Sequence, residues 1–326
     1  MIREGSKSFH AASLILPKDV RLAARSIYAF CRMADDRIDE CRDPATGLRR
    51  LSERLAAVYA GYPEDSPVDR AFCWVVNAYA IPRAVPEGLL EGFAWDIEGR
   101  QYQTFEDLKS YATRVAGTVG VMMALVMGER RQAALSRAID LGIAMQLTNI
   151  ARDIGEDAAA GRCYIPEEWL RDARLDLSVL KEAESADGRI GELTRRMLSA
   201  AEPFYASGRE GIGFLRRDCR GAIRAAADIY RDIGRCIAAN GYDSIRFRAV
   251  VPKHRKVFLA ANALVLRDPQ PTDRMTEHAG LFLLQAVQAQ PKRRRTAAAP
   301  LAGWPWVIDL FLRMEDETRL HSAADR

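Results

Sequence analysis

Apolar side chains recur along this chain at the three- and four-residue intervals of amphipathic helices, and strict alternation of β-branched residues is rare. Proline residues interrupt the pattern at intervals that suit helices, and Pro17 falls where the first turn of a long helix begins. The pattern predicts helices over 17–40, 48–60, 68–80, 86–101, 104–127, 131–156, 176–186, 190–210, 212–239, 253–267 and 277–290. The short stretch 187–189 is predicted to be a loop.

The segment 115–128, VAGTVGVMMALVMG, is apolar on all sides of its predicted helix. Such a helix is usually buried in the core of a protein. It could also form the wall of an apolar cavity, where Gly117 and Gly120 would leave room for a ligand or for a kink. The two interpretations are compatible, and both remain open at this point.

Because the pattern predicts helices and no strands, we expect an all-α fold. No internal repeat and no long linker divides the chain, so we expect one helical domain over 1–290. A basic and apolar tail, 291–326, follows it.

The composition excludes several classes of function. The net charge is only +4 over 326 residues, so nucleic acid is not an expected partner. The six cysteines form no CxxC pair and no disulfide framework, which indicates a reducing compartment. The longest apolar stretch, 116–128, is shorter than the roughly 20 residues of a membrane span, and the first residues lack the apolar run of a signal peptide. We therefore expect a cytoplasmic protein, with peripheral contact with the inner membrane as the alternative.

A first group of polar residues lies in the segment IYAFCRMADDRID. Tyr28, Arg32, Asp35 and Asp39 are spaced by four, three and four residues, so they project within about 60° of one another on a helix. The two stacked carboxylates repel each other unless a cation lies between them, and oxygen ligands suit magnesium better than zinc. Arg32 could contact a phosphate oxygen. A solvated acidic helix face is the alternative interpretation.

A second group lies in QLTNIARDIGEDAAAGRCYIP. Gln146, Asn149, Asp153 and Asp157 fall within about 80° of one another on a helix that is otherwise apolar. Burying this polar line is costly unless metal ions or diphosphate oxygens satisfy it. Arg152, beside the line, is a natural partner for a diphosphate. An exposed polar face is again the alternative.

If the two helices face each other across a cavity, magnesium ions between them would bind a diphosphate and assist its departure. An allylic cation left behind would need a dry, apolar pocket. The residues thus predict an enzyme that binds diphosphate groups with divalent cations.

Six motifs resemble, in order along the chain, those of the head-to-head trans-isoprenyl diphosphate synthases, which include squalene, dehydrosqualene and phytoene synthases. They are GSKSFHAASLILP, DDRID, YATRVAGTVGVMM, NIARDIGED, GRCYIPEEW and AADIYRDIG, and the resemblance spans roughly residues 4–260. The family implies an all-α isoprenoid synthase fold with a central apolar cavity. The whole set is most similar to the bacterial phytoene synthases.

The resemblance also implies residue roles. The metal ligands would be Asp35, Asp39, Asn149, Asp153 and Asp157, the four aspartates being catalytic. The substrate-binding residues would be Ser6, Lys7, Ser8, Tyr28, Arg32, Gln146, Arg152 and Tyr230. The implied ion is Mg²⁺, with Mn²⁺ as a substitute, and no NADPH is expected for phytoene.

The implied reaction joins two geranylgeranyl diphosphates to phytoene through a cyclopropyl diphosphate, with release of two diphosphates, in carotenoid biosynthesis. Two alternatives remain. A squalene or dehydrosqualene synthase would act on farnesyl diphosphate, and cavity depth would decide between the substrates. A helical assembly factor or lipid-binding module would keep the fold without the chemistry, although both acidic motifs are intact here.

The tail matches none of these motifs. It contains Lys292, Arg293, Arg294 and Arg295, followed by GWPWVIDLFLRM from Gly303. One interpretation is a solvated turn and a helix docked on the body. The other is contact with a membrane surface through basic residues and Trp304, Trp306 and Phe311.

Overall fold

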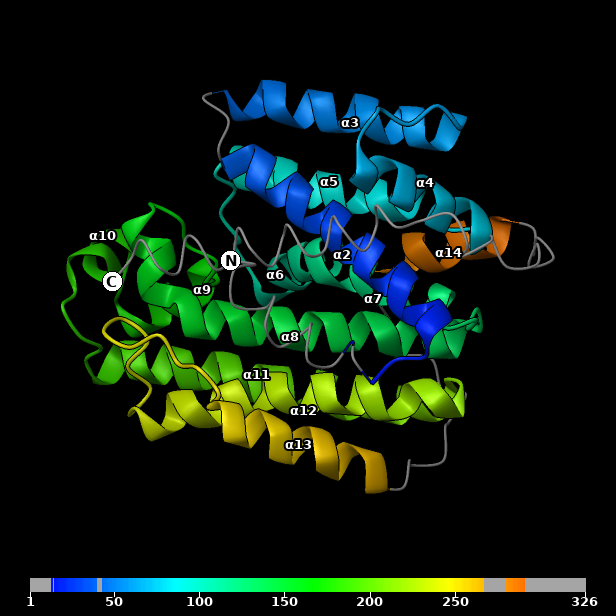
Figure 1. Cartoon of the computed structure of the whole chain (residues 1–326). Helices are drawn as coiled ribbons and strands as arrows, with labels where there is room; N and C mark the ends of the chain where they lie inside the picture. Colours follow the sequence, from blue (N-terminus) through cyan, green and yellow to red (C-terminus); the bar gives the residue numbers. More distant parts are fainter. Residues whose placement is uncertain (1–12, 14, 40–42, 267–279, 291–326) are drawn as a thin grey trace.

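The structure, a computed structural model, describes residues 13, 15–39, 43–266 and 280–290 of the chain (Figure 1). Within these ranges every regular element is a helix. The elements are α2 (Lys18–Asp39), α3 (Pro44–Ala60), α4 (Pro67–Ala78), α5 (Ala84–Ile97), α6 (Phe105–Ala112), the π-helical turn η1 (Thr113–Gly117), α7 (Thr118–Val126), α8 (Gln132–Ala159), α9 (Glu167–Ala173), α10 (Leu177–Glu182), α11 (Gly188–Gly211), the 3₁₀ turn η2 (Ile212–Phe214), α12 (Arg217–Ala239), α13 (Lys253–Val265) and α14 (Leu281–Ala289). The predicted all-α fold is confirmed.

The longest helix, α8, lies at the centre of the molecule. It packs against α7 on one side and against α11 and α12 on the other (Figure 1). Beyond α12 lies α13, and α3 is outermost on the opposite side, over α4 and α5. One large core of buried apolar side chains runs through these layers.

Three details differ from the elements that the sequence predicts. The predicted helix 104–127 is interrupted by η1, where one turn is π-helical. The predicted loop 187–189 is instead the start of α11, because the Asp187 carboxylate accepts hydrogen bonds from the backbone N–H groups of Arg189 and Ile190 and so caps the helix. The seven-residue helix α9 was not predicted.

Glycine lets α7 and α8 approach each other closely. A Cβ built on Gly120 would overlap the Ala138 carbonyl, and one on Gly142 would lie 2.5 Å from the Ala116 carbonyl oxygen. In both cases the obstacle is backbone, which cannot rotate away. The glycines in 115–128 therefore serve helix packing, and Gly120 also lines a cavity described below.

We expect Gly142→Ala to lower the free energy of unfolding by about 2 kcal/mol, because the backbone of η1 must move to admit the methyl group. Gly188→Ala is the matched control. A Cβ at that helical glycine meets nothing within 4 Å, so alanine should leave stability unchanged or raise it slightly. Urea unfolding of both variants measures the difference. Equal stabilities would contradict the close contact.

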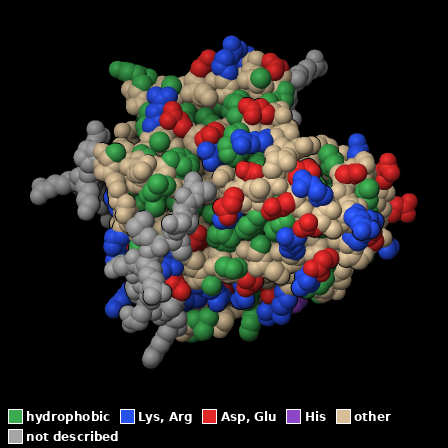
Figure 2. Space-filling view, turned by 180° about the vertical axis from the view of Figure 1, so that it is seen from behind, with side chains coloured by type: hydrophobic (Ala, Val, Ile, Leu, Met, Phe, Trp, Pro, Cys, Tyr) green, Lys and Arg blue, Asp and Glu red, His purple; other side chains and the backbone are tan. Residues whose placement is uncertain are grey.

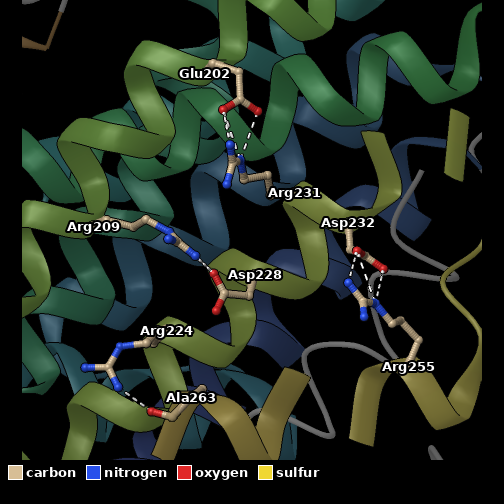
Figure 3. A network of polar contacts seen from close by, with 8 residues as sticks. All are labelled: Glu202, Arg209, Arg224, Asp228, Arg231, Asp232, Arg255 and Ala263. Carbon is tan, nitrogen blue, oxygen red and sulfur yellow. Dashed lines mark hydrogen bonds and ion pairs between the residues drawn. The ribbon is translucent and has the colours of Figure 1, made fainter. Parts of the chain in front are cut away.

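Ion pairs join the helices on the α11–α12–α13 side of the molecule. Arg231 donates to Glu202 of α11 at 2.6 Å, and Arg209 pairs with Asp228 (Figure 3). Seen from behind, the surface of the molecule carries interspersed acidic and basic side chains (Figure 2).

Two further findings bear on the cellular setting. The five described cysteines, Cys31, Cys73, Cys163, Cys219 and Cys236, are free thiols. In the described part of the chain, no helix combines the length and the apolar character needed to cross a membrane.

Candidate active site

A cavity of about 310 Å³ opens inside the helical bundle, along α8. Side chains of α2, α5, α7, α11 and α12 complete its wall, which is largely apolar. The α8 positions that line it run from Ala134 to Asn149, and fifteen helical steps correspond to roughly 22 Å. The cavity is therefore long and narrow, a shape that suits an extended hydrocarbon chain.

Both predicted polar stripes reach this cavity. Tyr28 and Asp35 line it from α2, Gln146 and Asn149 from α8, and Tyr230 from α12. The carboxyl-terminal halves of α2, α8 and α12 lie at the same end of the bundle, on the left of Figure 1. These predicted residues thus gather at one end of a chamber whose wall is largely apolar, although Arg137 also lines it from the first half of α8.

The second stripe is buried. Gln146 is 7% exposed, Asp153 1% and Asp157 5%. The alternative of a solvated polar face is therefore wrong for this helix. Burying these polar groups is costly unless they have hydrogen-bonding or charged partners, so the partners of each group indicate what it can bind.

Two arginines hold Asp153, which lies behind the cavity wall. Arg152 donates to its two carboxylate oxygens at 2.7 and 2.6 Å, and Arg248 donates to the same oxygens at 2.9 and 3.4 Å. Burial alone would raise the pKa of Asp153, but the two guanidinium groups outweigh it and lower that pKa below its usual value. Asp153 is thus ionised and already paired with cations.

Arg248 was not predicted from the sequence, because it reaches the site from the segment after α12. That segment crosses α8 at Gly155, whose N–H donates to the Ser244 carbonyl at 3.1 Å. A Cβ on Gly155 would lie 2.7 Å from the Ile245 carbonyl oxygen. The glycine in the NIARDIGED motif therefore permits the crossing that brings Arg248 onto Asp153.

Asp157 lies one turn beyond Asp153 and has a different environment. Its Oδ2 atom is buried and makes no hydrogen bond within the described structure. Burial, with a further contribution from the negative charge of Asp153, raises the pKa of Asp157 to about 7. An orphaned buried carboxylate oxygen on the same helix stripe as Asn149 is the kind of group that a divalent cation would satisfy.

The described side chains do not form a closed metal cage. Among them, no cluster of three or more His, Cys, Asp or Glu residues could hold an ion alone. A cation between Asp35 and the α8 carboxylates would need further oxygen ligands, which a diphosphate and water supply. The residues present fit a shared Mg²⁺ better than a structural metal.

The remaining predicted residues are placed as follows. Arg32 pairs with Asp36 at 3.2 Å and does not line the cavity. The backbone of Asp39 ends α2, but its side chain lies outside the described structure. Ser6, Lys7 and Ser8 also lie outside the described residues.

A second polar group in the cavity wall was not predicted. Asp96 of α5 accepts hydrogen bonds from the hydroxyl groups of Tyr111 and Tyr164, both at 2.9 Å. Asp96 and Tyr111 line the cavity, and burial raises the pKa of both phenols. These tyrosines are therefore neutral donors. The same helix also carries Glu87 and Glu91, so the sequence alone did not distinguish Asp96.

Comparison with known proteins identifies the family of this chain. The squalene/phytoene synthase family model matches residues 2–255. A phytoene synthase of Rhodobacter capsulatus is 47% identical over 266 residues, which cover 81% of this chain and 78% of that protein. A phytoene synthase of Cereibacter sphaeroides is 43% identical over 317 residues, covering 91% and 89% of the two chains. A crystal structure of a dehydrosqualene synthase superposes with a TM-score of 0.74 at 35% identity, covering 80% of this chain and 92% of that one.

Proposed function

Because the chain belongs to the squalene/phytoene synthase family, we propose that it is a prenyltransferase that condenses two geranylgeranyl diphosphates to phytoene in carotenoid biosynthesis. The observation that carries the proposal is the meeting of two polar helical stripes at one end of a long apolar cavity. The curated relatives at 43–47% identity are phytoene synthases, so a squalene or dehydrosqualene synthase is not favoured.

The acidic residues would hold Mg²⁺, for which Mn²⁺ could substitute. Asp35 and Asn149 present their oxygens to the cavity, and Asp157 contributes a buried oxygen without a partner. The proposed set also includes Asp39 and Asp153. Bound Mg²⁺ would supply Lewis-acid stabilisation of the departing diphosphate.

Arginines neutralise charge at the same end of the cavity. Arg152 and Arg248 already contact Asp153, and their guanidinium forks also match phosphate oxygens. We assign the diphosphate contacts to these residues together with Arg32, Gln146 and the segment that contains Ser6, Lys7 and Ser8.

The apolar part of the cavity would protect the carbocations. In the proposed reaction the first substrate loses diphosphate, the double bond of the second attacks the resulting cation, and loss of a proton closes the ring of a cyclopropyl diphosphate. A second ionisation, rearrangement and loss of a proton give phytoene. The faces of Tyr28, Phe93, Tyr111 and Tyr230 line the chamber and can stabilise positive charge. Burial raises the pKa of Tyr230, so its phenol stays neutral and weakly nucleophilic.

Product analysis tests the function. We expect the purified chain, given geranylgeranyl diphosphate and Mg²⁺, to form phytoene at the same rate with and without NADPH. Farnesyl diphosphate should be converted much more slowly. A hydrocarbon of thirty carbons as the main product, or a requirement for NADPH, would overturn the assignment to phytoene.

The location of the protein is also a proposal. We assign it to the cytoplasm, with peripheral contact with the inner membrane, because the product is a water-insoluble hydrocarbon. The tail 291–326, to which membrane contact was attributed, lies outside the described residues. Measuring vesicle binding by a chain truncated after Gln290 would separate the contribution of the tail to membrane binding from that of the helical body.

A further inference from the structure

Exposed apolar side chains are concentrated on one part of the surface. Among the described residues, ten large hydrophobic side chains are exposed, and seven of them lie between Phe247 and Leu266. The most exposed of these seven are Val265 at 79%, Val257 at 69% and Leu264 at 60%. Scattered apolar side chains are normal on a protein surface, but a contiguous group on one element indicates an interaction site.

The group forms one face of α13. Val257, Phe258, Ala261, Leu264 and Val265 are exposed and fall within about 120° of one another around the helix. The opposite face, with Leu259 and Ala263, is buried against α12. The helix is therefore apolar on both sides over its last three turns, and only one side has a partner in the described structure.

Polar contacts fix the orientation of α13. Arg255 in its first turn donates to both carboxylate oxygens of Asp232 at 3.2 Å, and Arg224 donates to the Ala263 carbonyl near its end (Figure 3). Because α12 holds both ends, the apolar face is held outward. It lies at the outermost layer of the bundle (Figure 1).

The chain segment that carries this face is basic, although Arg248 and Arg255 are paired with acids of α8 and α12. From Ser244 to Leu266 the chain contains five Lys or Arg residues and His254, but no Asp or Glu. Lys253 and His254 are exposed and lie one turn before Val257 and Phe258, respectively, each within about 40° of that residue around the helix. Figure 2 shows basic side chains beside hydrophobic ones along the lower edge of the molecule, where α13 lies in Figure 1.

We propose that the outer face of α13 docks on an anionic lipid bilayer, with Val257, Phe258, Leu264 and Val265 inserted between the acyl chains and Lys253 at the headgroups. Helices that lie in a membrane interface combine such an apolar face with basic residues that meet anionic headgroups. A second copy of the chain is the weaker occupant, because pairing two α13 faces would bring together the exposed Lys253 and His254 of both copies, and the 244–266 segment contains no acid to pair with them. This docking surface belongs to the folded body and is distinct from the tail.

Vesicle co-sedimentation of the full chain tests the proposal. The vesicles consist of phosphatidylcholine with or without phosphatidylglycerol. We expect binding that requires phosphatidylglycerol and weakens with salt. Phe258→Ser combined with Val265→Ser should lower the partition coefficient about tenfold or more, since two inserted apolar side chains are lost. The matched control is Tyr62→Ser with Val179→Ser, which removes two exposed apolar side chains from other elements and should bind normally.

Three results would overturn the proposal. The first is equal binding by the α13 variant and the control variant. The second is complete loss of binding when the chain is truncated after Gln290, with no effect of the α13 changes, which would assign the contact to the tail. The third is a dimer, detected by sedimentation velocity without lipid, that the α13 changes abolish. Unchanged thermal unfolding and unchanged turnover of detergent-dispersed substrate would show that the α13 variant is folded. If the parent and all variants lacked turnover, the proposed reaction would be wrong, but the membrane proposal would be unaffected.

Discussion

Replacing Asp35 with asparagine is expected to lower kcat/KM by about 10²- to 10⁴-fold, the effect of losing a metal ligand that acts in the transition state. Asp35 lines the cavity at the end where Gln146 and Asn149 also lie. Asparagine keeps the shape of the side chain but removes the charge that would attract Mg²⁺. We expect little change in stability, because this side chain is only half-buried and asparagine has nearly the same volume.

Asp36→Asn is the matched control for this measurement. Asp36 is the next residue of α2, but its side chain does not line the cavity and pairs with Arg32 instead. Initial rates over a range of Mg²⁺ concentrations should show a raised Mg²⁺ requirement for Asp35→Asn alone. Near-normal turnover by folded Asp35→Asn would remove this residue from the metal site.

Asp153→Asn would test the site less cleanly. The sequence alone suggests that this change spares the fold, as for any metal ligand. The structure changes that expectation, because Arg152 and Arg248 both pair with Asp153. Without the carboxylate, a guanidinium group that is only 3% exposed would remain buried without its charged partner, which is costly. Loss of activity in this variant would therefore combine an unstable site with a missing ligand.

The long helices could be predicted from the sequence because their apolar faces repeat over many turns. Predicted boundaries lie within a few residues of α2, α8, α11 and α12. The short helix α9 has too few turns for a periodic signal, and its buried Trp169 and Leu170 depend on the tertiary contacts. The π-helical turn in 113–117 likewise depends on packing between neighbouring helices and not on local propensity.

The part of the candidate site that lies on a single helix could be predicted from the sequence. Gln146, Asn149, Asp153 and Asp157 lie on one helix, so their shared face follows from spacing. Contacts between distant segments do not follow from spacing. The pairing of Arg248 with Asp153 joins residues 95 positions apart, and the bond from Tyr164 to Asp96 joins residues 68 apart. Such contacts depend on the assembled fold.

The second large effect concerns Asp157 and the pH dependence of stability. Burial raises the pKa of this carboxyl from 3.8 to about 7 in the folded chain, so between these values the folded state binds a proton that the unfolded state releases. Stability without metal must therefore fall as pH rises through this window. Asp157 alone should lower the free energy of unfolding by about 3 kcal/mol between about pH 5 and about pH 8.

Urea unfolding in the presence of EDTA at the two pH values measures this fall. Asp157→Asn should remove it, because the amide has no proton to lose, and the variant should be more stable than the parent at the higher pH. Asp172→Asn is the control, since Asp172 is 67% exposed and forms only a surface pair with Arg196. If the parent and Asp157→Asn showed the same pH dependence, the carboxylate would have to be satisfied in the metal-free chain. The proposal that its unpartnered oxygen binds a cation would then fail. If Asp157→Asn instead removed the pH dependence, the ionised Asp157 carboxylate would be shown to destabilise the metal-free chain, and Mg²⁺ binding could relieve that destabilisation.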